Sequence, residues 1–126
     1  MTIVGVGVDA TDIPRIAQAI ERYGDRFLRR ILTDHELAYC LSRRDPAPHV
    51  AGRFAAKEAG MKAIGTGHSQ GVLWKDLEVF RQGGPPQLRF HNAAARHFQA
   101  RGAVQALVTI THSRELALAQ VLLLGD

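Results

Sequence analysis

The feature that most constrains the fold of this chain is a long helical segment built largely from small side chains. The helical pattern runs from about Ala47 to Ile64 and ends at two glycines, Gly65 and Gly67. Its apolar stripe is formed by Val50, Phe54, Met61 and Ile64, and one flank of the stripe carries Ala51, Ala55 and Ala59. Because small side chains let a second backbone or a ligand approach closely, we expect this helix to border a crevice.

Three charged side chains lie unusually close to that stripe. Glu58 lies one turn after Phe54 and one turn before Lys62, on the flank that the alanines form. One interpretation is an ordinary i, i+4 pair between Glu58 and Lys62, which would contribute about 0.2–0.5 kcal/mol. The other is that both side chains stand at the edge of the crevice. Lys57 lies nearer the centre of the stripe, and we expect it to extend its ammonium group outward into solvent.

The rest of the chain alternates between predicted strands and helices. Apolar runs predict a buried strand at 3–8, a hairpin of 76–80 and 86–90, and a pair of longer strands at 103–113 and 115–124. Helical patterns lie at 13–23, 25–32, 33–41 and 92–101, and 43–49 is predicted to be a loop. Thr33 and Glu36 have the spacing of a capping box. Together these patterns predict an α+β fold in which a single small antiparallel sheet packs on one long helix, with residues 1–126 forming a single domain.

The composition is that of an ordinary globular domain, with 126 residues of which 46% are hydrophobic and 22% charged. Cys40 is the only cysteine, so no disulfide can form within the chain; we expect a reducing environment and a small, buried Cys40 side chain. No apolar run approaches the roughly 18 residues of a membrane span, and the N-terminus lacks a basic leader. The sequence therefore predicts a cytoplasmic protein without a membrane partner.

Positive charge is concentrated near the N-terminus. Lys and Arg outnumber Asp and Glu by 16 to 12, and the excess gathers at Arg15, Arg22, Arg26, Arg29 and Arg30. Such a cluster is typical of a surface for an acidic protein or a phosphate-bearing ligand, of a small basic nucleic-acid-binding domain, or of a plain solvated helix face. An aromatic content of only 6%, and the acids Asp12, Glu21 and Asp25 within the basic run, argue against nucleic acid.

Asp9 and Glu58 are the candidate ligands for a metal ion. Asp9 directly follows the first predicted strand, and a strand beside the long helix would bring its carboxylate to Glu58. Two carboxylates, completed by water and phosphate oxygens, are the usual way in which proteins hold Mg²⁺. Lys62 and the backbone N–H groups of residues 65–67 would then bind phosphate, although the same glycines equally form a simple helix end.

Three separated segments resemble the signature motifs of a known enzyme family: GVGVDATDIPRI at 5–16, RFAAKEAGMKAIGTG at 53–67 and ITHSRELALAQVLL at 110–123. They are similar to those of the bacterial holo-[acyl-carrier-protein] synthases, the small trimeric 4′-phosphopantetheinyl transferases, and the resemblance extends over nearly the whole chain. It implies the fold of that family, with active sites between the protomers of a homotrimer. The implied reaction is Mg²⁺-dependent transfer of 4′-phosphopantetheine from coenzyme A to a serine of apo acyl carrier protein, which releases adenosine 3′,5′-bisphosphate and supports fatty acid biosynthesis.

The resemblance also implies roles for individual residues. Asp9 and Glu58 match the residues that hold Mg²⁺ against the pyrophosphate of coenzyme A. The positions that match coenzyme A contacts are Arg53, Lys62, Gly65, Thr66, Pro86 and His112, with His112 contributed by a neighbouring subunit. The docking residues for the acidic carrier protein would be Arg15, Arg22 and Arg26. We assign catalysis to Glu58, Lys62 and Asp9, with the hypothesis that Glu58 is the general base that takes the serine proton.

The chain departs from the family pattern at one turn. It has Gly84-Pro85-Pro86 where relatives usually have Gly-Lys-Pro, so the nucleotide contact of that lysine is not carried over. The two prolines would stiffen the turn. Trp74 and Phe80 are interpreted as core or interface residues.

Overall fold

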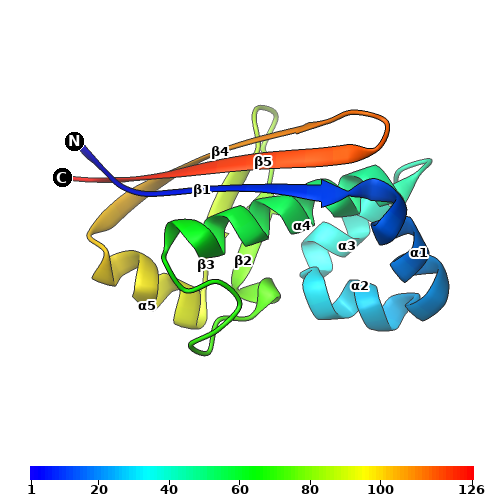
Figure 1. Ribbon diagram of the computed structural model, residues 1–126, viewed down its shortest axis with the longest axis horizontal. Helices are drawn as coiled ribbons and strands as arrows, with labels where there is room; N and C mark the ends of the chain where they lie inside the picture. The colour runs from blue at the N-terminus through cyan, green and yellow to red at the C-terminus, as the bar shows by residue number, and fades with distance from the viewer.

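The structure, a computed structural model that describes residues 1–126, confirms the α+β class (Figure 1). In chain order the elements are β1 (Thr2–Asp12), α1 (Ile13–Tyr23), α2 (Asp25–Ile31), α3 (Asp34–Leu41), α4 (Pro46–Ala63), the short 3₁₀ helix η1 (Trp74–Asp76), β2 (Leu77–Phe80), β3 (Gln87–Phe90), α5 (Asn92–Ala100), β4 (Ala103–His112) and β5 (Leu116–Gly125). Every helix and strand predicted from the sequence is present. The two chain ends lie side by side, because Thr2 of β1 pairs with Gly125 of β5.

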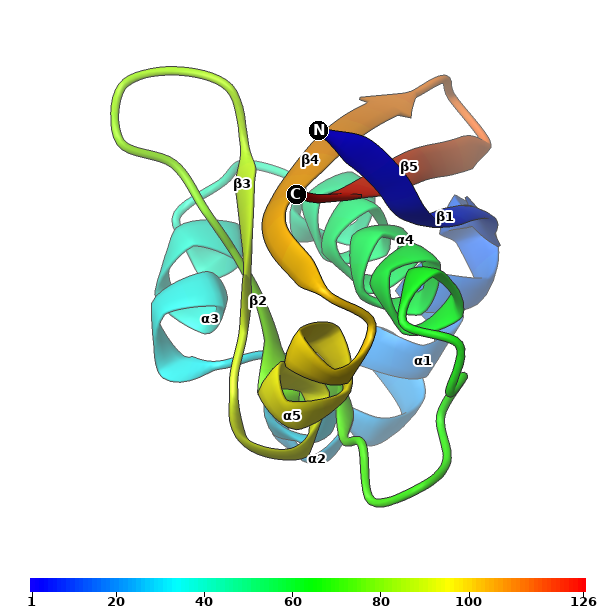
Figure 2. The same cartoon turned by 90° about the vertical axis from the view of Figure 1, so that its left-hand side faces the viewer.

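The strands form two antiparallel sheets rather than the single sheet that we expected. One sheet has the order β1-β5-β4, and the other consists of β2 and β3 alone. Figure 1 shows the physical reason: the β2–β3 hairpin runs across the direction of β1 and β5. Strands β2 and β3 therefore cannot continue the hydrogen-bond ladder of the three-stranded sheet. Both sheets nevertheless pack on α4, which passes between the three-stranded sheet and the remaining elements (Figure 2).

Strand β1 is longer and less buried than predicted. It continues past Asp9 to Asp12, because β5 offers paired residues as far as Leu116. Asp9 therefore lies within the strand, opposite Ala119, rather than just beyond it. Exposed and buried residues alternate along β1, so one face of the strand contacts α4 and the other is open.

Helix α4 is buried on nearly all sides, which replaces the one-sided apolar stripe expected from the sequence. Twelve of its 18 residues are buried, including Arg53 and Lys57. A helix that is surrounded in this way needs no amphipathic pattern. It also begins at Pro46, inside the segment 43–49 predicted to be a loop, because proline is well tolerated in the first turn of a helix.

Lys57 points inward, and the prediction that it reaches solvent is wrong. Its fully buried Nζ donates to Glu36 Oε1 at 2.6 Å, to the Leu77 carbonyl at 2.6 Å and to the Trp74 carbonyl at 3.1 Å. Glu36 Oε2 in turn accepts the N–H of Val79 at 2.8 Å. Burial lowers the pKa of Lys57, and the Glu36 carboxylate opposes that shift. The ion pair thereby ties α4 to α3, η1 and β2.

Two further local predictions are confirmed. Thr33 and Glu36 form the capping box at the start of α3, with the Thr33 side chain accepting from the Glu36 N–H and the Glu36 side chain from the Thr33 N–H. Cys40 is completely buried in a cluster of apolar side chains, and this burial raises the pKa of its thiol to about 11. None of the helices combines the length and the apolar character needed to cross a membrane.

The contact between β1 and α4 depends on two glycines of β1. A Cβ added to Gly7 would overlap the Ala59 carbonyl oxygen, and a Cβ added to Gly5 would overlap that of Ala63. In both cases the obstructing atom is backbone and cannot move independently of its helix. The strand therefore lies directly on the helix main chain, as the small side chains of α4 predicted.

We expect Gly7→Ala to lower the free energy of unfolding by about 3 kcal/mol or more, at or above the upper end of overpacking costs, because the helix backbone must shift. Thermal and urea denaturation measure this loss. Gly84→Ala is the matched control, since an added Cβ there meets nothing within 4 Å, and it should change stability by less than about 0.5 kcal/mol. Equal stability of the two variants would show that β1 does not depend on the missing side chain of Gly7 to lie against α4.

Candidate functional site

Asp9 and Lys62 meet where β1 lies across the last turn of α4. Lys62 Nζ donates to Asp9 Oδ1 at 3.1 Å and to the Val8 carbonyl at 2.9 Å. Asp9 Oδ2 accepts the Thr11 hydroxyl at 2.9 Å. Both carboxylate oxygens are thus held in place, one by a cation and one by a hydroxyl. Residues 53 positions apart in the sequence are brought into direct contact.

Glu58 shares a cavity with Asp9. This cavity, of about 340 Å³, is lined by Asp9 and Glu58, by residues of α1, and by Phe27 and Phe54. Lys62 pairs with Asp9 rather than with Glu58, so the simple i, i+4 pair considered from the sequence does not form. Glu58 Oε2 instead accepts the indole N–H of Trp74 at 3.1 Å.

The donor set of this cavity fits a hard divalent cation that keeps most of its own water. The two carboxylates face one volume, and nowhere does the structure gather three or more His, Cys, Asp or Glu side chains into a group able to hold a metal ion. An all-protein cage of the zinc or calcium type is therefore not formed. Mg²⁺, by contrast, is usually bound by one or two carboxylates together with phosphate and water oxygens.

The glycine-rich segment after α4 forms the helix end and not an open row of N–H donors. The N–H of Gly65 donates to the Lys62 carbonyl at 3.0 Å, and those of Thr66 and Gly67 donate to the Met61 carbonyl at 3.1 and 3.2 Å. Backbone groups expected to cradle phosphate are already used, because the helix satisfies its last carbonyls first. Gly65 has a φ of 82° and lies against the guanidinium of Arg101, a basic neighbour that sequence reasoning missed.

A second cluster surrounds Arg53 on another side of α4. The Arg53 guanidinium lies 4.2 Å from the centroid of the Tyr39 ring, and its Nε is buried with no hydrogen-bond partner. His49 lies between Tyr39 and His112, with ring centroids 5.9 and 6.4 Å away. Burial and the nearby Arg53 charge lower the pKa of His49. An orphaned buried N–H is a costly feature that an acceptor from a ligand would relieve.

Within one chain these two clusters do not form one site. Arg53 lines a separate cavity of about 380 Å³ that contains neither Asp9 nor Glu58. Pro86 lies in the β2–β3 turn, which projects away from α4 (Figure 2), and it does not line the cavity of Asp9 and Glu58. The predicted coenzyme A contacts are therefore divided between different faces of the molecule.

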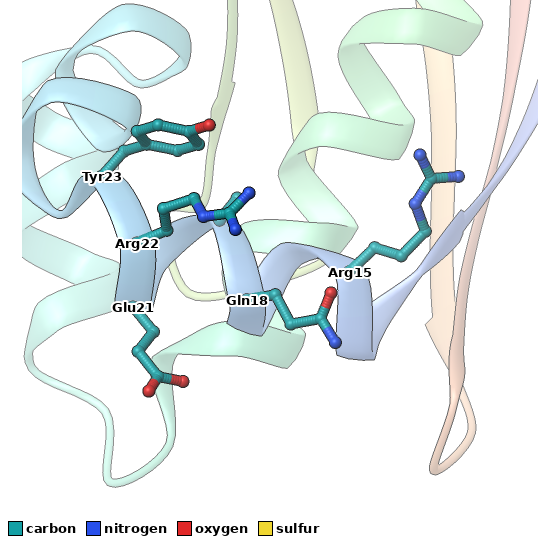
Figure 3. Close-up of a pocket in the computed structure, with 6 residues that line it drawn as sticks. Arg15, Gln18, Glu21, Arg22 and Tyr23 are labelled. Atoms are coloured by element: carbon teal, nitrogen blue, oxygen red, sulfur yellow. The ribbon is translucent and has the colours of Figure 1, made fainter.

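Two of the three predicted docking arginines, Arg15 and Arg22, line a hollow next to the Asp9–Glu58 cavity. An open hollow of about 690 Å³ runs along α1 and is lined by Arg15, Gln18, Ala19, Glu21, Arg22 and Tyr23. Figure 3 shows Arg15 and Arg22 extending to the same side of the helix, while Glu21 extends the other way. Arg15 also lines the cavity of Asp9 and Glu58, so the basic face leads directly to the carboxylates. Arg26 is exposed on α2 and does not line either hollow.

The fold is that of a small α+β protein in which a strand lies on a central helix, and the strand and the helix together carry two carboxylates and a lysine. These side chains are suited to binding a diphosphate together with a divalent cation. The family model of the 4′-phosphopantetheinyl transferase superfamily matches residues 5–120. The chain therefore belongs to this superfamily.

Known proteins of this family are similar over almost the whole chain. A holo-[acyl-carrier-protein] synthase of Koribacter versatilis is 49% identical over 122 residues, which cover 96% of this chain and 98% of that protein. The crystal structure of a holo-[acyl-carrier-protein] synthase from Neisseria meningitidis has a TM-score of 0.89 at 29% identity, and the match covers 98% of this chain and 99% of that one. A synthase from Bacillus anthracis, crystallised in complex with CoA (3′,5′-ADP), has a TM-score of 0.82 at 34% identity and is matched over 100% of both chains.

Proposed function

We propose that this chain is a holo-[acyl-carrier-protein] synthase, which transfers 4′-phosphopantetheine from coenzyme A to a serine of apo acyl carrier protein and releases adenosine 3′,5′-bisphosphate. The family match over residues 5–120 supports the activity, and it supports treating residues 1–126 as one transferase domain. The observation that carries the proposal is the cavity that Asp9 and Glu58 both line, beside the basic face of α1. We further propose a cytoplasmic location and a role in fatty acid biosynthesis.

Asp9 and Glu58 are the proposed Mg²⁺ ligands. When bound, Mg²⁺ would neutralise the diphosphate and polarise the phosphorus that the serine attacks. Lys62 already contacts Asp9 at 3.1 Å, so it adds a second positive charge at the same place and would stabilise the leaving phosphate. Glu58 would take the proton of the serine hydroxyl while the serine Oγ–P bond forms and the P–O bond to adenosine 3′,5′-bisphosphate breaks.

The remaining coenzyme A contacts are proposed to come from two protomers. Lys62 would bind the phosphates, and Gly65 and Thr66 would border them without donating their N–H groups, which the helix end uses. Arg53, with its unpaired Nε, would bind the nucleotide end together with His112 and Pro86. Because one chain separates these groups, a neighbouring protomer is needed to complete the site. CoA is the ligand of the Bacillus anthracis relative, which supports coenzyme A as the substrate here.

A homotrimer is proposed on the outer face of the three-stranded sheet. Val6 of β1, Leu122 of β5 and Leu107 of β4 pair across the sheet in one row, and Val6 and Leu107 are 54% and 45% exposed. The same face also exposes Ile3, Val8, Leu116 and Leu118. A contiguous apolar face of this kind is uncommon on a monomer and typical of a subunit interface. Packing three such faces together would bury them and bring one chain's site beside its neighbour.

The carrier protein is proposed to dock on α1. Arg15 and Arg22 lie on one side of the helix, next to the cavity in which the serine would react (Figure 3). Arg26 would extend this surface onto α2. Such positive charges speed the association of an acidic protein. A nucleic-acid site would need more aromatic or basic side chains than α1 provides.

We expect incubation with coenzyme A, Mg²⁺ and apo acyl carrier protein to add one 4′-phosphopantetheine group to the carrier, as measured by mass spectrometry. Glu58→Gln should lower kcat by about 100-fold or more, because the amide can neither accept the serine proton nor bind the cation as a carboxylate. An unmodified carrier with the wild-type protein would refute the proposed function. Near-normal turnover of Glu58→Gln would instead refute the roles proposed for Glu58, as general base and as carboxylate ligand of the cation, and leave the transferase activity standing.

Reversing Arg15 and Arg22 to Glu should raise the KM for the carrier protein by about tenfold or more and leave coenzyme A affinity unchanged, since the docking charges are reversed. Steady-state kinetics at two salt concentrations measure this effect, which should shrink as salt screens the charges. Arg89→Glu with Arg96→Glu is a control of equal charge on β3 and α5, away from α1, and should have little effect. An equal rise in the KM for the carrier protein in both variants would mean that net charge alone causes the effect, and it would contradict docking on α1.

Replacing Leu107 and Val6 by Lys should dissociate the proposed trimer, because three copies of each charge would be buried in the interface. Sedimentation velocity is expected to give a trimer for the wild type and a monomer for the double variant, with transferase activity lost in the monomer. A wild-type monomer that is fully active would contradict the shared site.

A further inference from the structure

The carboxylate of Glu58 has one hydrogen-bond donor in the structure, and that donor is the indole of Trp74. Trp74 Nε1 donates to Glu58 Oε2 at 3.1 Å, across 16 residues of sequence. An indole offers a single N–H and no acceptor, so it binds one carboxylate oxygen and leaves the other free. The indole therefore adds no charge to the site, but its N–H orients the Glu58 carboxylate.

Trp74 is itself held by four contacts, one to its main chain and three to its ring. Its main-chain carbonyl accepts the buried Lys57 ammonium at 3.1 Å, which fixes the η1 backbone to α4. Its ring stacks on His68 with centroids 3.7 Å apart at 14°, and packs against Phe54 at 5.9 Å. The guanidinium of Arg30 lies 5.6 Å from the ring centroid. With both backbone and ring held, the N–H has a fixed direction.

A comparable arrangement holds the second proposed ligand. Asp9 receives the Thr11 hydroxyl on Oδ2 and the Lys62 ammonium on Oδ1. Glu58 is longer by one torsion angle, and the terminal torsion of a glutamate has a broad, two-fold preference. Without a donor its oxygens would exchange places freely. Glu58 thus has the greater need of an orienting partner.

We propose that Trp74 is a positioning residue for Glu58: its N–H fixes Oε2 and leaves Oε1 as the oxygen that binds a cation shared with Asp9. The inference rests on the proposed function, because it assigns Glu58 to a Mg²⁺ site. Residues that orient metal ligands typically change metal affinity by about 10–100-fold when removed. Lys57 supports the same geometry one step further away, through the Trp74 carbonyl.

The direct test is Trp74→Phe, which keeps an aromatic ring and removes the N–H. We expect the Mg²⁺ concentration that gives half-maximal activity to rise about tenfold or more, while the thermal midpoint and the KM for coenzyme A change little. His68→Phe is the matched control, since it keeps a ring stacked on an intact indole, and it should leave the Mg²⁺ requirement within about threefold of wild type. An unchanged Mg²⁺ requirement in Trp74→Phe would overturn the inference.

A spectroscopic test needs no catalysis, because Trp74 is the only tryptophan of the chain. Its emission should change on titration with Mg²⁺ in the coenzyme A-bound protein, and Glu58→Ala should shift the emission even without metal, since the indole loses its acceptor. An emission that is constant while wild-type activity saturates with Mg²⁺, or that ignores Glu58→Ala, would overturn the inference and leave the proposed function intact. Wild-type activity that needs no divalent ion would overturn the metal site together with this inference.

Discussion

The close approach of strand β1 to the backbone of helix α4 is the constraint on which the rest of the structure depends. Gly5 and Gly7 have no side chain to separate the strand from the Ala63 and Ala59 carbonyls. At that distance Asp9, two residues beyond Gly7, reaches Lys62 and shares a cavity with Glu58. A bulkier residue at either glycine would move the strand outward and separate the carboxylates. The packing of the core and the geometry of the site therefore have one common cause.

Three neighbouring charges on α4 have three different surroundings. Lys57 is enclosed and paired with Glu36, Glu58 lines the cavity, and Lys62 is exposed and paired with Asp9. Enclosing Lys57 is costly in desolvation, and its three hydrogen bonds and one carboxylate partner offset that cost. Its contacts also hold η1, and through η1 the indole that meets Glu58. In this way a buried ion pair with no direct part in the chemistry helps to determine the orientation of a residue that the proposed reaction requires.

A single chain explains the proposed reaction only in part. Asp9 and Glu58 line one cavity beside α1, and Lys62 pairs with Asp9, whereas Arg53 and His112 belong to another cluster and Pro86 to a projecting turn. The exposed apolar face of the β1-β5-β4 sheet gives a physical reason for chains to associate, and association would also supply the missing half of a site. The division of the coenzyme A contacts and the open sheet face thus support the same proposal, that the functional unit is an assembly of chains.

The sequence by itself determined the α+β class, the order of the helices and strands, the capping box of α3 and the burial of Cys40, because each depends on local periodicity or on the chemistry of a few adjacent residues. It also predicted that Asp9 and Glu58 would lie near one another, and the structure has both in the lining of one cavity. Only the tertiary structure decided that Lys57 turns inward, that Lys62 pairs with Asp9 rather than Glu58, that residues 65–67 close their helix, and that Trp74 binds Glu58. These outcomes depend on which distant groups lie opposite each side chain once α4 is surrounded. A helix covered on every side has no amphipathic pattern from which that could be predicted.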